Sequence, residues 1–229
     1  MKHYDSIPRI QDDGTLKGEI VWGFNKLDGQ NFCATYKVRK NSWGPFGSRT
    51  RTVDENDLQF GQTVKYFFDH GYDSILTKCV KDHWKKGEVF QGVEEITFFF
   101  EWYGPKSFAG KHDFWDETNG EMRLALIDVF LKKKGYMEPK DYYEIFKDSG
   151  IEIPELIHKG SLNADIVSDI QNNDWTAPGA KYPTVKEGVV FKRSTLLKGQ
   201  RRPSVKVKTK WWIEKLHSMY SEEECKLLE

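Results

Sequence analysis

The chain has 229 residues and carries 35 Lys and Arg residues against 35 Asp and Glu residues, so its formal net charge is zero. This length is enough for one domain with a sizeable buried core, and we expect a single domain over residues 1–229. The neutral balance excludes a strongly basic or acidic protein, and net charge therefore says nothing about the binding partner.

Three cysteines are scattered along the chain and never occur in C-x-x-C spacing. This usage indicates a reducing compartment and favours neither a disulfide framework nor a zinc site. No apolar run approaches the length of a transmembrane helix, and residues 1–5 do not begin a signal peptide. We therefore expect an intracellular, cytoplasmic protein with no membrane partner, encoded either by a virus or by a cell.

Segments rich in β-branched and aromatic residues alternate irregularly with segments of helical periodicity. The predicted strands are residues 19–24, 31–38, 89–103, 122–130, 185–192 and 204–208. The predicted helices are residues 62–85 with an interruption at Gly71, 139–148, 163–172 and 211–228. Because there is no regular β-α-β alternation, we expect an α+β fold with largely antiparallel sheets.

The most informative stretch is Lys26-Leu-Asp28-Gly29-Gln-Asn31, which lies between two apolar-rich segments. Taken alone, its Asp-Gly pair predicts a β-hairpin turn, and the lysine before it is an ordinary surface charge. Five further motifs follow it along the chain. They are S-R-T at 48–50, F-E-W-Y-G at 100–104, L-I-D-V at 126–129, E-G-V-V-F-K at 187–192 and V-K-V-K at 205–208.

This ordered set resembles the covalent nucleotidyltransferase superfamily, which contains ATP-dependent polynucleotide ligases and mRNA capping enzymes. The resemblance extends from Lys26 to Lys208, most of the chain. It implies a nucleotidyltransferase domain in which antiparallel sheets, flanked by helices, surround a nucleotide cleft. Only 21 residues follow Lys208, so we expect no OB-fold and no C-terminal accessory domain.

The resemblance implies that Lys26 is the nucleophile. Its amine attacks the α-phosphate of ATP, pyrophosphate leaves, and the lysyl-AMP passes AMP to a 5′-phosphate end before a 3′-hydroxyl displaces the AMP. An amine attacks only when it is unprotonated, so nearby cations must lower its pKa. The expected cations are Lys192, Lys206, Lys208 and a bound Mg²⁺, with Mn²⁺ as the alternative metal.

The resemblance also implies a set of nucleotide-binding residues, which are Asp28, Gly29, Asn31, Arg49, Glu101, Glu187, Lys192, Lys206 and Lys208. Arg49 would grip a phosphate bidentately, with Arg39 and Arg51 as competitors and an exposed strand arginine as the alternative reading. Glu101 ends an apolar run, where an unpaired carboxylate is costly. It would bind the ribose or a metal-bound water, and the alternative is a salt bridge at the strand end.

Glu187 would help to hold the metal, and Lys192 would contact the α-phosphate. In a regular strand, residues 187 and 192 point to opposite faces, so both reach one site only through a twist or bulge at Gly188. Lys206 and Lys208 share one face of their strand, which suits the developing charge of phosphoryl transfer. For Asp128, a structural carboxylate is favoured over a catalytic one.

A basic segment spans residues 186–215, with ten Lys or Arg and two acidic residues. Because it contains two of the motifs, we interpret it as an electrostatic footprint for phosphates. Trp211 and Trp212 lie in this segment. Core packing is the default expectation for them, and stacking on a base is the alternative.

Asn31 in K-x-x-G-x-N, with Ser-Arg-Thr downstream, resembles the branch of phage RNA ligases and trypanosome RNA-editing ligases. Asp28 and Leu124 depart from that branch, which often has histidine and a stacking aromatic residue at these positions. We therefore expect an ATP- and Mg²⁺-dependent RNA ligase acting on nicked or broken RNA, aided by an accessory protein in place of the missing domain. The alternatives are a minimal ATP-dependent DNA ligase, an mRNA guanylyltransferase, and a non-catalytic RNA- or nucleotide-binding module.

Overall fold

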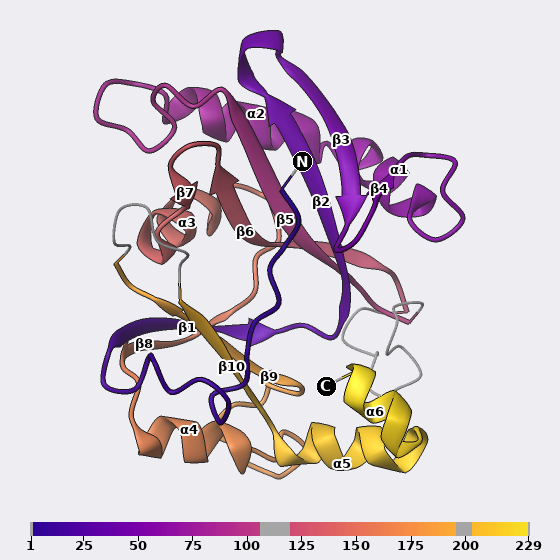
Figure 1. Ribbon diagram of the computed structural model, residues 1–229, viewed down its shortest axis with the longest axis vertical. Helices are drawn as coiled ribbons and strands as arrows, with labels where there is room; N and C mark the ends of the chain where they lie inside the picture. Colours follow the sequence, from indigo (N-terminus) through magenta and orange to yellow (C-terminus); the bar gives the residue numbers. More distant parts are fainter. Residues whose placement is uncertain (1, 106–119, 196–202, 229) are drawn as a thin grey trace. The chain divides into compact units, whose positions relative to one another are not determined.

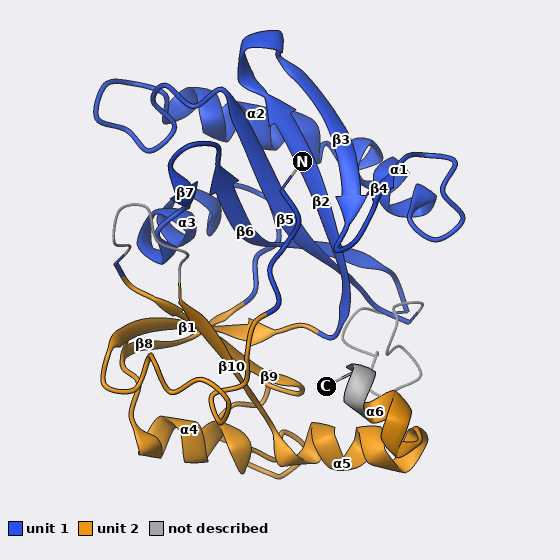
Figure 2. Cartoon of the chain, viewed as in Figure 1, with its two compact units in different colours: residues 1–6, 28–154, 195–202 blue, residues 7–27, 155–194, 203–229 orange. Residues whose placement is uncertain are grey.

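The computed structural model describes residues 2–105, 120–195 and 203–228, which form two compact units (Figure 1; Figure 2). The first unit comprises Met1–Ser6, Asp28–Pro154 and Thr195–Arg202, and the second comprises Ile7–Leu27, Glu155–Ser194 and Pro203–Glu229. The boundary after Leu27 therefore divides the first motif between the units. The single domain expected over residues 1–229 stays a prediction.

The first unit contains a six-stranded antiparallel sheet with the strand order β4-β3-β2-β5-β6-β7. Its strands are β2 (Gly29–Lys37), β3 (Ser42–Ser48), β4 (Thr52–Val53), β5 (Glu95–Tyr103), β6 (Arg123–Leu131) and β7 (Gly135–Tyr136). The short 3-10 turn η1 (Val38–Lys40) follows β2, and the helices are α1 (Gly61–Asp69), α2 (Tyr72–Asp82) and α3 (Pro139–Phe146).

Aromatic packing holds the centre of this sheet in register. Phe32 of β2 lies opposite Phe100 of β5, and both side chains are fully buried. Phe67 of α1 contacts both rings, at centroid distances of 6.4 and 5.9 Å. Because cross-strand aromatic pairs specify strand register, this packing also places Asn31 opposite Glu101.

The second unit contains a four-stranded antiparallel sheet with the strand order β10-β9-β1-β8. Its strands are β1 (Ile20–Lys26), β8 (Leu156–Ser161), β9 (Gly188–Arg193) and β10 (Ser204–Lys208), and its helices are α4 (Ala164–Gln171), α5 (Lys210–Met219) and α6 (Glu222–Leu228). Beyond β10, Arg9 forms a parallel bridge with Lys206. The N-terminal segment thus extends the edge of this sheet.

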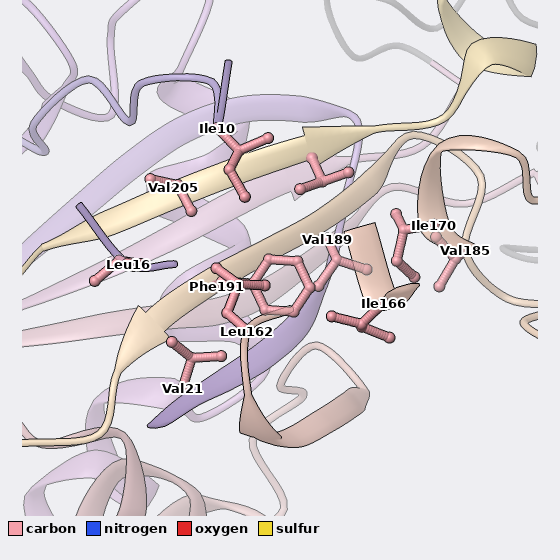
Figure 3. Packing of buried hydrophobic residues seen from close by; sticks show 11 residues of the cluster. Ile10, Leu16, Val21, Leu162, Ile166, Ile170, Val185, Val189, Phe191 and Val205 are labelled. Atoms are coloured by element: carbon pink, nitrogen blue, oxygen red, sulfur yellow. The ribbon is translucent and has the colours of Figure 1, made fainter. Parts of the chain in front are cut away.

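Alternate residues of β9 and β10 form the apolar core of the second unit (Figure 3). Val189, Phe191, Val205 and Val207 are fully buried, and they pack against α4. Successive residues of a strand point to opposite faces, so the residues between these four face away from the core. That second face carries the charged motif residues.

The predicted α+β class with antiparallel sheets and flanking helices is confirmed. The strand predicted at 204–208 is β10 itself. The strand predicted at 89–103 begins only at Glu95, because residues 89–94 form turns that bury Phe90. Within the described ranges, no helix is long and apolar enough to cross a membrane.

Several elements differ from the sequence-based expectation. Gly71, with φ of 69°, separates α1 from α2 as predicted, but the single helix predicted at 211–228 is two helices. Tyr220, with φ of −130° and ψ of 154°, is extended and ends α5. Strand β3 was missed because Gly44, Pro45 and Gly47 have the composition of a turn, and pairing with β2 overrides that local preference.

Gly188 occupies a position that no other residue fits. Its φ is +156°, and a Cβ atom on it would lie 2.1 Å from the carbonyl oxygen of Val207. Gly188 pairs with Lys26 on one side and with Lys208 on the other. It therefore keeps the position between the two lysines free of a side chain.

We expect Gly188→Ala to lower the free energy of unfolding by about 2 kcal/mol or more, because β9 and β10 must separate to admit the methyl group. Gly179 is the matched control, since its φ is +75° and a Cβ on it would meet nothing within 4 Å. Gly179→Ala should cost about 1 kcal/mol of backbone strain. Urea unfolding measures both, and equal losses would show that the close approach to Val207 is unimportant.

Candidate functional site

Lys26 and Lys208 lie on either side of Gly188 in the sheet of the second unit. Lys26 ends β1 and Lys208 ends β10, and each is the cross-strand partner of Gly188. Residues opposite one another in a sheet present their side chains on the same face. The two ammonium groups are therefore held near each other by strand register, although 182 positions separate them in the sequence.

The carboxylate of Glu187 joins these two lysines. Lys26 Nζ donates to Glu187 Oε2 at 2.7 Å, and Lys208 Nζ lies 3.1 Å from Glu187 Oε1. The side chains of Glu187 and Lys208 are only 4% and 3% exposed, whereas that of Lys26 is 23% exposed. Lys26 is thus the member of this ion-paired group that solvent reaches most readily.

The structure resolves how Glu187 reaches the same face as Lys192. Glu187 precedes β9, which begins only at Gly188, so strand alternation does not govern its side chain. The pairing of β9 with both neighbours is regular from Gly188 onward, and no bulge is present there. Of the twist or bulge expected at Gly188, the pairing shows no bulge from Gly188 onward, and the unusual φ of Gly188 supplies the change of direction.

Burial by itself raises the pKa of a carboxyl group, but the charges and hydrogen bonds of Lys26 and Lys208 outweigh it here. The pKa of Glu187 is held below its usual value. Glu187 is therefore ionised at neutral pH and is a poor acceptor for a proton from Lys26. Its chemical role in this arrangement is to compensate charge and to position the lysine.

Lys192 and Lys206 complete the cationic face. Lys192 is 3% exposed, and its Nζ lies 5.3 Å from the ring centroid of Phe24. Burial, followed by the charges of Lys208 and Lys26, lowers the pKa of Lys206 to about 8. A depressed lysine pKa is the expected result of several like charges gathered on one face.

Arg9 is a cation of this face that no sequence motif indicates. Ile10 N donates to Lys206 O at 3.1 Å, and Lys206 N donates to Pro8 O at 2.9 Å. In this bridge Arg9 is the partner of Lys206, while Ile10 is buried in the core on the other face. The charge of Arg9 contributes to the low pKa of Lys206. The sequence carries no signal of this, because the pairing joins residues 197 positions apart.

Trp212 packs beneath Lys208 and is not open to a base. Lys208 Nζ lies 3.6 Å from the centroid of the Trp212 ring, and Trp212 is 1% exposed. The ring forms a small apolar cluster with Leu216 and Cys225. The default expectation of core packing is confirmed for Trp212, and stacking on a base is excluded for this residue. Lys198, Arg201 and Arg202 of the basic segment lie outside the described residues.

The remaining predicted residues belong to the first unit. Asp28 lies between β1 and β2, and Gly29 begins β2 opposite Tyr103. A Cβ on Gly29 would lie 2.5 Å from the carbonyl oxygen of Trp102, so the close pairing of β2 with β5 requires glycine here.

Asn31 offers a buried polar atom to a ligand. Its side chain is 9% exposed and its Nδ2 donates to Phe100 O at 3.3 Å. Its Oδ1 is buried and has no hydrogen-bond partner within the described parts of the chain. Buried polar atoms are nearly always paired, so this acceptor, opposite Glu101, is available to a hydrogen-bond donor of a ligand.

Arg49 is the best placed of the three candidate arginines. Ser48 ends β3 opposite Phe32, and its hydroxyl accepts from the backbone of Arg51 to form the turn that carries Arg49. Arg51 forms an ion pair with Asp57, and Arg39 lies 3.4 Å from Glu94. Arg49, which is exposed, forms no ion pair with any described residue.

Asp128 is a structural carboxylate, as favoured from the sequence. It is fully buried, and it accepts hydrogen bonds from the hydroxyl of Tyr4 at 3.2 Å and from the backbone of Val129 at 3.0 Å. It therefore anchors the N-terminal segment to the sheet of the first unit.

Lys26, Glu187, Lys192, Lys206 and Lys208 are thus brought together in the second unit. The first unit holds Asp28, Gly29, Asn31, Arg49 and Glu101. The predicted metal ligands Glu187 and Glu101 belong to different units. Among residues 2–105, 120–195 and 203–228, no group of three or more His, Cys, Asp or Glu side chains forms a metal cage by itself.

Residues 19–208 match the model of the RNA ligase family, and this range covers most of the chain. The chain belongs to the RNA ligase family. All six motifs lie within the matched range, including the Lys26–Glu187–Lys208 ion pairs. No curated protein matches the sequence.

Solved structures of Naegleria gruberi RNA ligase share the fold of this RNA ligase family member. One variant of that ligase with ATP and Mn matches with a TM-score of 0.67 at 17% identity. Another variant with AMP and Mn gives 0.63 at 17% identity, and the ligase with PPi gives 0.62 at 16% identity. Each match covers 95% of this chain and 58% of the Naegleria chain. The present chain therefore spans about three fifths of the length of these ligases.

We expect Glu187→Gln to lower the free energy of unfolding by about 3 kcal/mol, because it leaves two lysines facing each other without their buried counter-charge. Glu144→Gln is the control, since Glu144 forms an exposed pair with Lys147 at 2.7 Å. That change should cost less than about 0.5 kcal/mol. Urea unfolding near neutral pH measures both variants. Similar values for the two would refute a structural role of the Glu187 carboxylate.

Proposed function

We propose that this protein is an ATP-dependent RNA ligase that joins 5′-phosphate and 3′-hydroxyl ends through a lysyl-AMP at Lys26. The observation that carries the proposal is the 2.7 Å contact between Lys26 and the buried Glu187, on a face that also holds Lys192, Lys206 and Lys208. A solvated surface lysine needs neither a buried carboxylate partner nor neighbouring cations. A lysine that must attack a phosphate needs a fixed position and cationic neighbours.

The first step of the proposed ligation is a nucleophilic substitution at phosphorus. The neutral amine of Lys26 attacks the α-phosphorus of ATP, the N–P bond forms, the bond to pyrophosphate breaks, and the amine proton goes to solvent. The neighbouring cations favour the neutral amine, while Glu187 favours the charged one. A cation that pairs with Glu187 in place of Lys26 would tip this balance toward the neutral, reactive amine.

The lysines of the cationic face then stabilise the phosphates. Lys192, Lys206 and Lys208 are anchored on strands, so they present positive charge to the transferring group without reorganisation. In the first unit, the orphaned Oδ1 of Asn31 and the carboxylate of Glu101 supply acceptors for the nucleoside, and Arg49 supplies a donor for a phosphate.

The residues present fit the way in which Mg²⁺ is bound by nucleotide enzymes. Mg²⁺ usually keeps several waters and takes one or two carboxylates together with substrate phosphates, so a dedicated protein cage is not required. Glu187 in the second unit and Glu101 in the first stay the proposed carboxylate ligands, and Mn²⁺ is the alternative ion. When bound, the metal neutralises phosphate charge and acts as a Lewis acid.

RNA is the proposed polynucleotide, and the family match supports this choice. Joining of nicked or broken RNA by this chain is proposed to take place in the cytoplasm, with an accessory protein presenting the ends. If the protein is a minimal DNA ligase, it should join nicked DNA faster than nicked RNA. If it is an mRNA guanylyltransferase, GTP should label it. If it is a non-catalytic binding module, neither ATP nor GTP should label it.

We expect the intact mass of the protein to rise by one AMP after incubation with ATP and Mg²⁺, and Lys26→Ala to abolish the rise. Lys17→Ala is the control, because Lys17 is an exposed lysine outside the motifs. A GMP-sized increase with GTP would favour capping. An adduct that persists in Lys26→Ala would refute Lys26 as the nucleophile.

Because the pKa of Lys206 is lowered, we expect ATP binding to depend on pH. The pKa of about 8 means that Lys206 is charged at pH 7 and loses its charge as the pH rises to 9. The affinity for a non-transferable α,β-methylene analogue of ATP should therefore fall above pH 8, by at most about tenfold per pH unit.

Lys206→Arg is the matched control, since arginine keeps its charge throughout this range. Titrations at pH 7, 8 and 9 should show that the variant loses most of the pH dependence of binding. If the variant and the wild type fall in parallel, Lys206 is not the group that titrates.

A further inference from the structure

A second cationic surface lies in the first unit, away from the predicted motif residues. It consists of three segments whose Lys and Arg side chains are exposed: residues 39–40 of η1, residues 81–86 at the end of α2 and after it, and residues 132–134 in the turn before β7. These segments hold eight Lys or Arg residues and one acidic residue. We call them the lysine-rich surface.

Ion pairs and hydrogen bonds show that the three segments adjoin one another. Glu94 lies 3.4 Å from Arg39 and 3.5 Å from Lys133, so it joins the first segment to the third. Lys134 Nζ donates to Val89 O at 3.1 Å, and Phe90 N donates to His83 O at 3.4 Å. The short segment 88–94 therefore links all three.

The surface keeps an excess of positive charge after its ion pairs are counted. With the adjoining Glu88, Glu94 and Glu95 included, eight cations face four carboxylates, a net charge of +4 with histidine neutral. Lys40, Lys81, Lys85 and Lys86 are exposed, and the charge of Lys85 acts on Asp82. Because the whole chain is neutral, this excess is a local concentration of charge.

Strand geometry gives the distance of this surface from the motif residues of the same unit. Lys37 and Glu95 are paired at one end of β2 and β5, and Asn31 and Glu101 are paired six residues along. At about 3.3 Å per residue, the two ends lie about 20 Å apart. A nucleotide held at the Asn31 end does not reach the lysine-rich surface, whereas a polynucleotide does.

The chemistry of the surface favours a phosphate backbone over a membrane. Membrane-surface segments combine cations with exposed apolar side chains. The exposed large apolar residues of the described chain are Ile20, Leu58 and Phe68, and none belongs to the lysine-rich surface. Lysines alone are sufficient to bind a nucleic acid backbone without sequence preference.

We propose that the lysine-rich surface binds the phosphate backbone of the RNA substrate at about 20 Å from the nucleotide-binding end of the first unit. This inference rests on the proposed function, because it takes RNA as the substrate. It adds a footprint that lies outside every motif of the family, and it makes affinity depend on the length of the RNA.

The test compares two nicked RNA duplexes that share the sequence around the nick. Their arms end about 15 Å and about 40 Å from the nick, on either side of the ~20 Å spacing. The test variant is Lys81→Gln, Lys85→Gln, Lys86→Gln, because these exposed lysines have no ion pairs to lose. The matched control is Lys17→Gln, Lys65→Gln, Lys140→Gln, which removes the same charge from exposed positions elsewhere.

We expect the wild type to bind the long duplex more tightly than the short one. The test variant should lose about tenfold in affinity for the long duplex, and the slope of log K against log salt should fall by about 3 for three lost phosphate contacts. Its affinity for the short duplex and its labelling by ATP should be unchanged. The control variant should behave as the wild type does with both duplexes.

Equal binding of the long duplex by the test variant and the wild type would overturn the inference, and so would an equal loss with both duplexes. Labelling by ATP reports separately on the proposed function, because it requires no RNA. A wild type that binds the long duplex through these lysines but is never labelled would refute the ligase and leave the RNA-binding surface standing.

Discussion

The buried carboxylate of Glu187 is the interaction on which the second unit depends. An ionised carboxylate that is almost completely buried costs several kcal/mol unless its charge is compensated. Lys26 and Lys208 provide that compensation, one at each oxygen. The arrangement requires β1, β9 and β10 to stay in one register, since a slip of one residue would turn the lysines to the apolar face. Gly188 enforces the register by excluding any side chain at the point where the three strands meet.

One carboxylate does not neutralise the face that surrounds it. Lys26, Lys192, Lys206, Lys208 and Arg9 share one face with a single anion, and burial, followed by the charges of Lys208, Lys26 and Arg9, lowers the pKa of Lys206. Natural sequences avoid such crowding where stability is the only requirement, and tolerate it at sites of function. A polyanion relieves the repulsion when it binds. The same charges that weaken the free protein would therefore strengthen a complex with a polyanion.

The sequence predicted the elements whose pattern is local. β10 follows directly from the alternation of Val205, Lys206, Val207 and Lys208, which gives an apolar face and a cationic face. It also predicted that Gly71 would interrupt a helix, because glycine alone adopts that backbone without strain. β3 could not be predicted in this way, because its glycines and proline disfavour a strand and only the neighbouring β2 makes it one.

The same distinction applies to the site. Motif order placed Glu187 with Lys26, but alternation within a strand pointed its side chain to the wrong face. The conflict disappears only when the start of β9 is known to be Gly188, which is a property of the pairing and not of the six-residue motif. Arg9 was missed altogether, because its position depends on a backbone bridge to Lys206 across almost the full length of the chain. Long-range pairing thus decides which cations are neighbours, whereas the motif decides only which residue types are present.

The first motif has a further consequence, because its residues are divided between two cores. Lys26 is held by the strand register of the second unit, and Asn31 by the aromatic packing of Phe32 and Phe100 in the first. Each group is therefore positioned by its own set of packing contacts, and Leu27 and Asp28 connect them covalently. In the first unit, Gly29 lies close to the backbone of Trp102. In the second unit, Gly188 likewise lies close to the backbone of Val207. A substitution in either core should accordingly displace the motif residues of that unit first. The first motif is continuous in the sequence, but each of its halves is held in place by the sheet of its own unit.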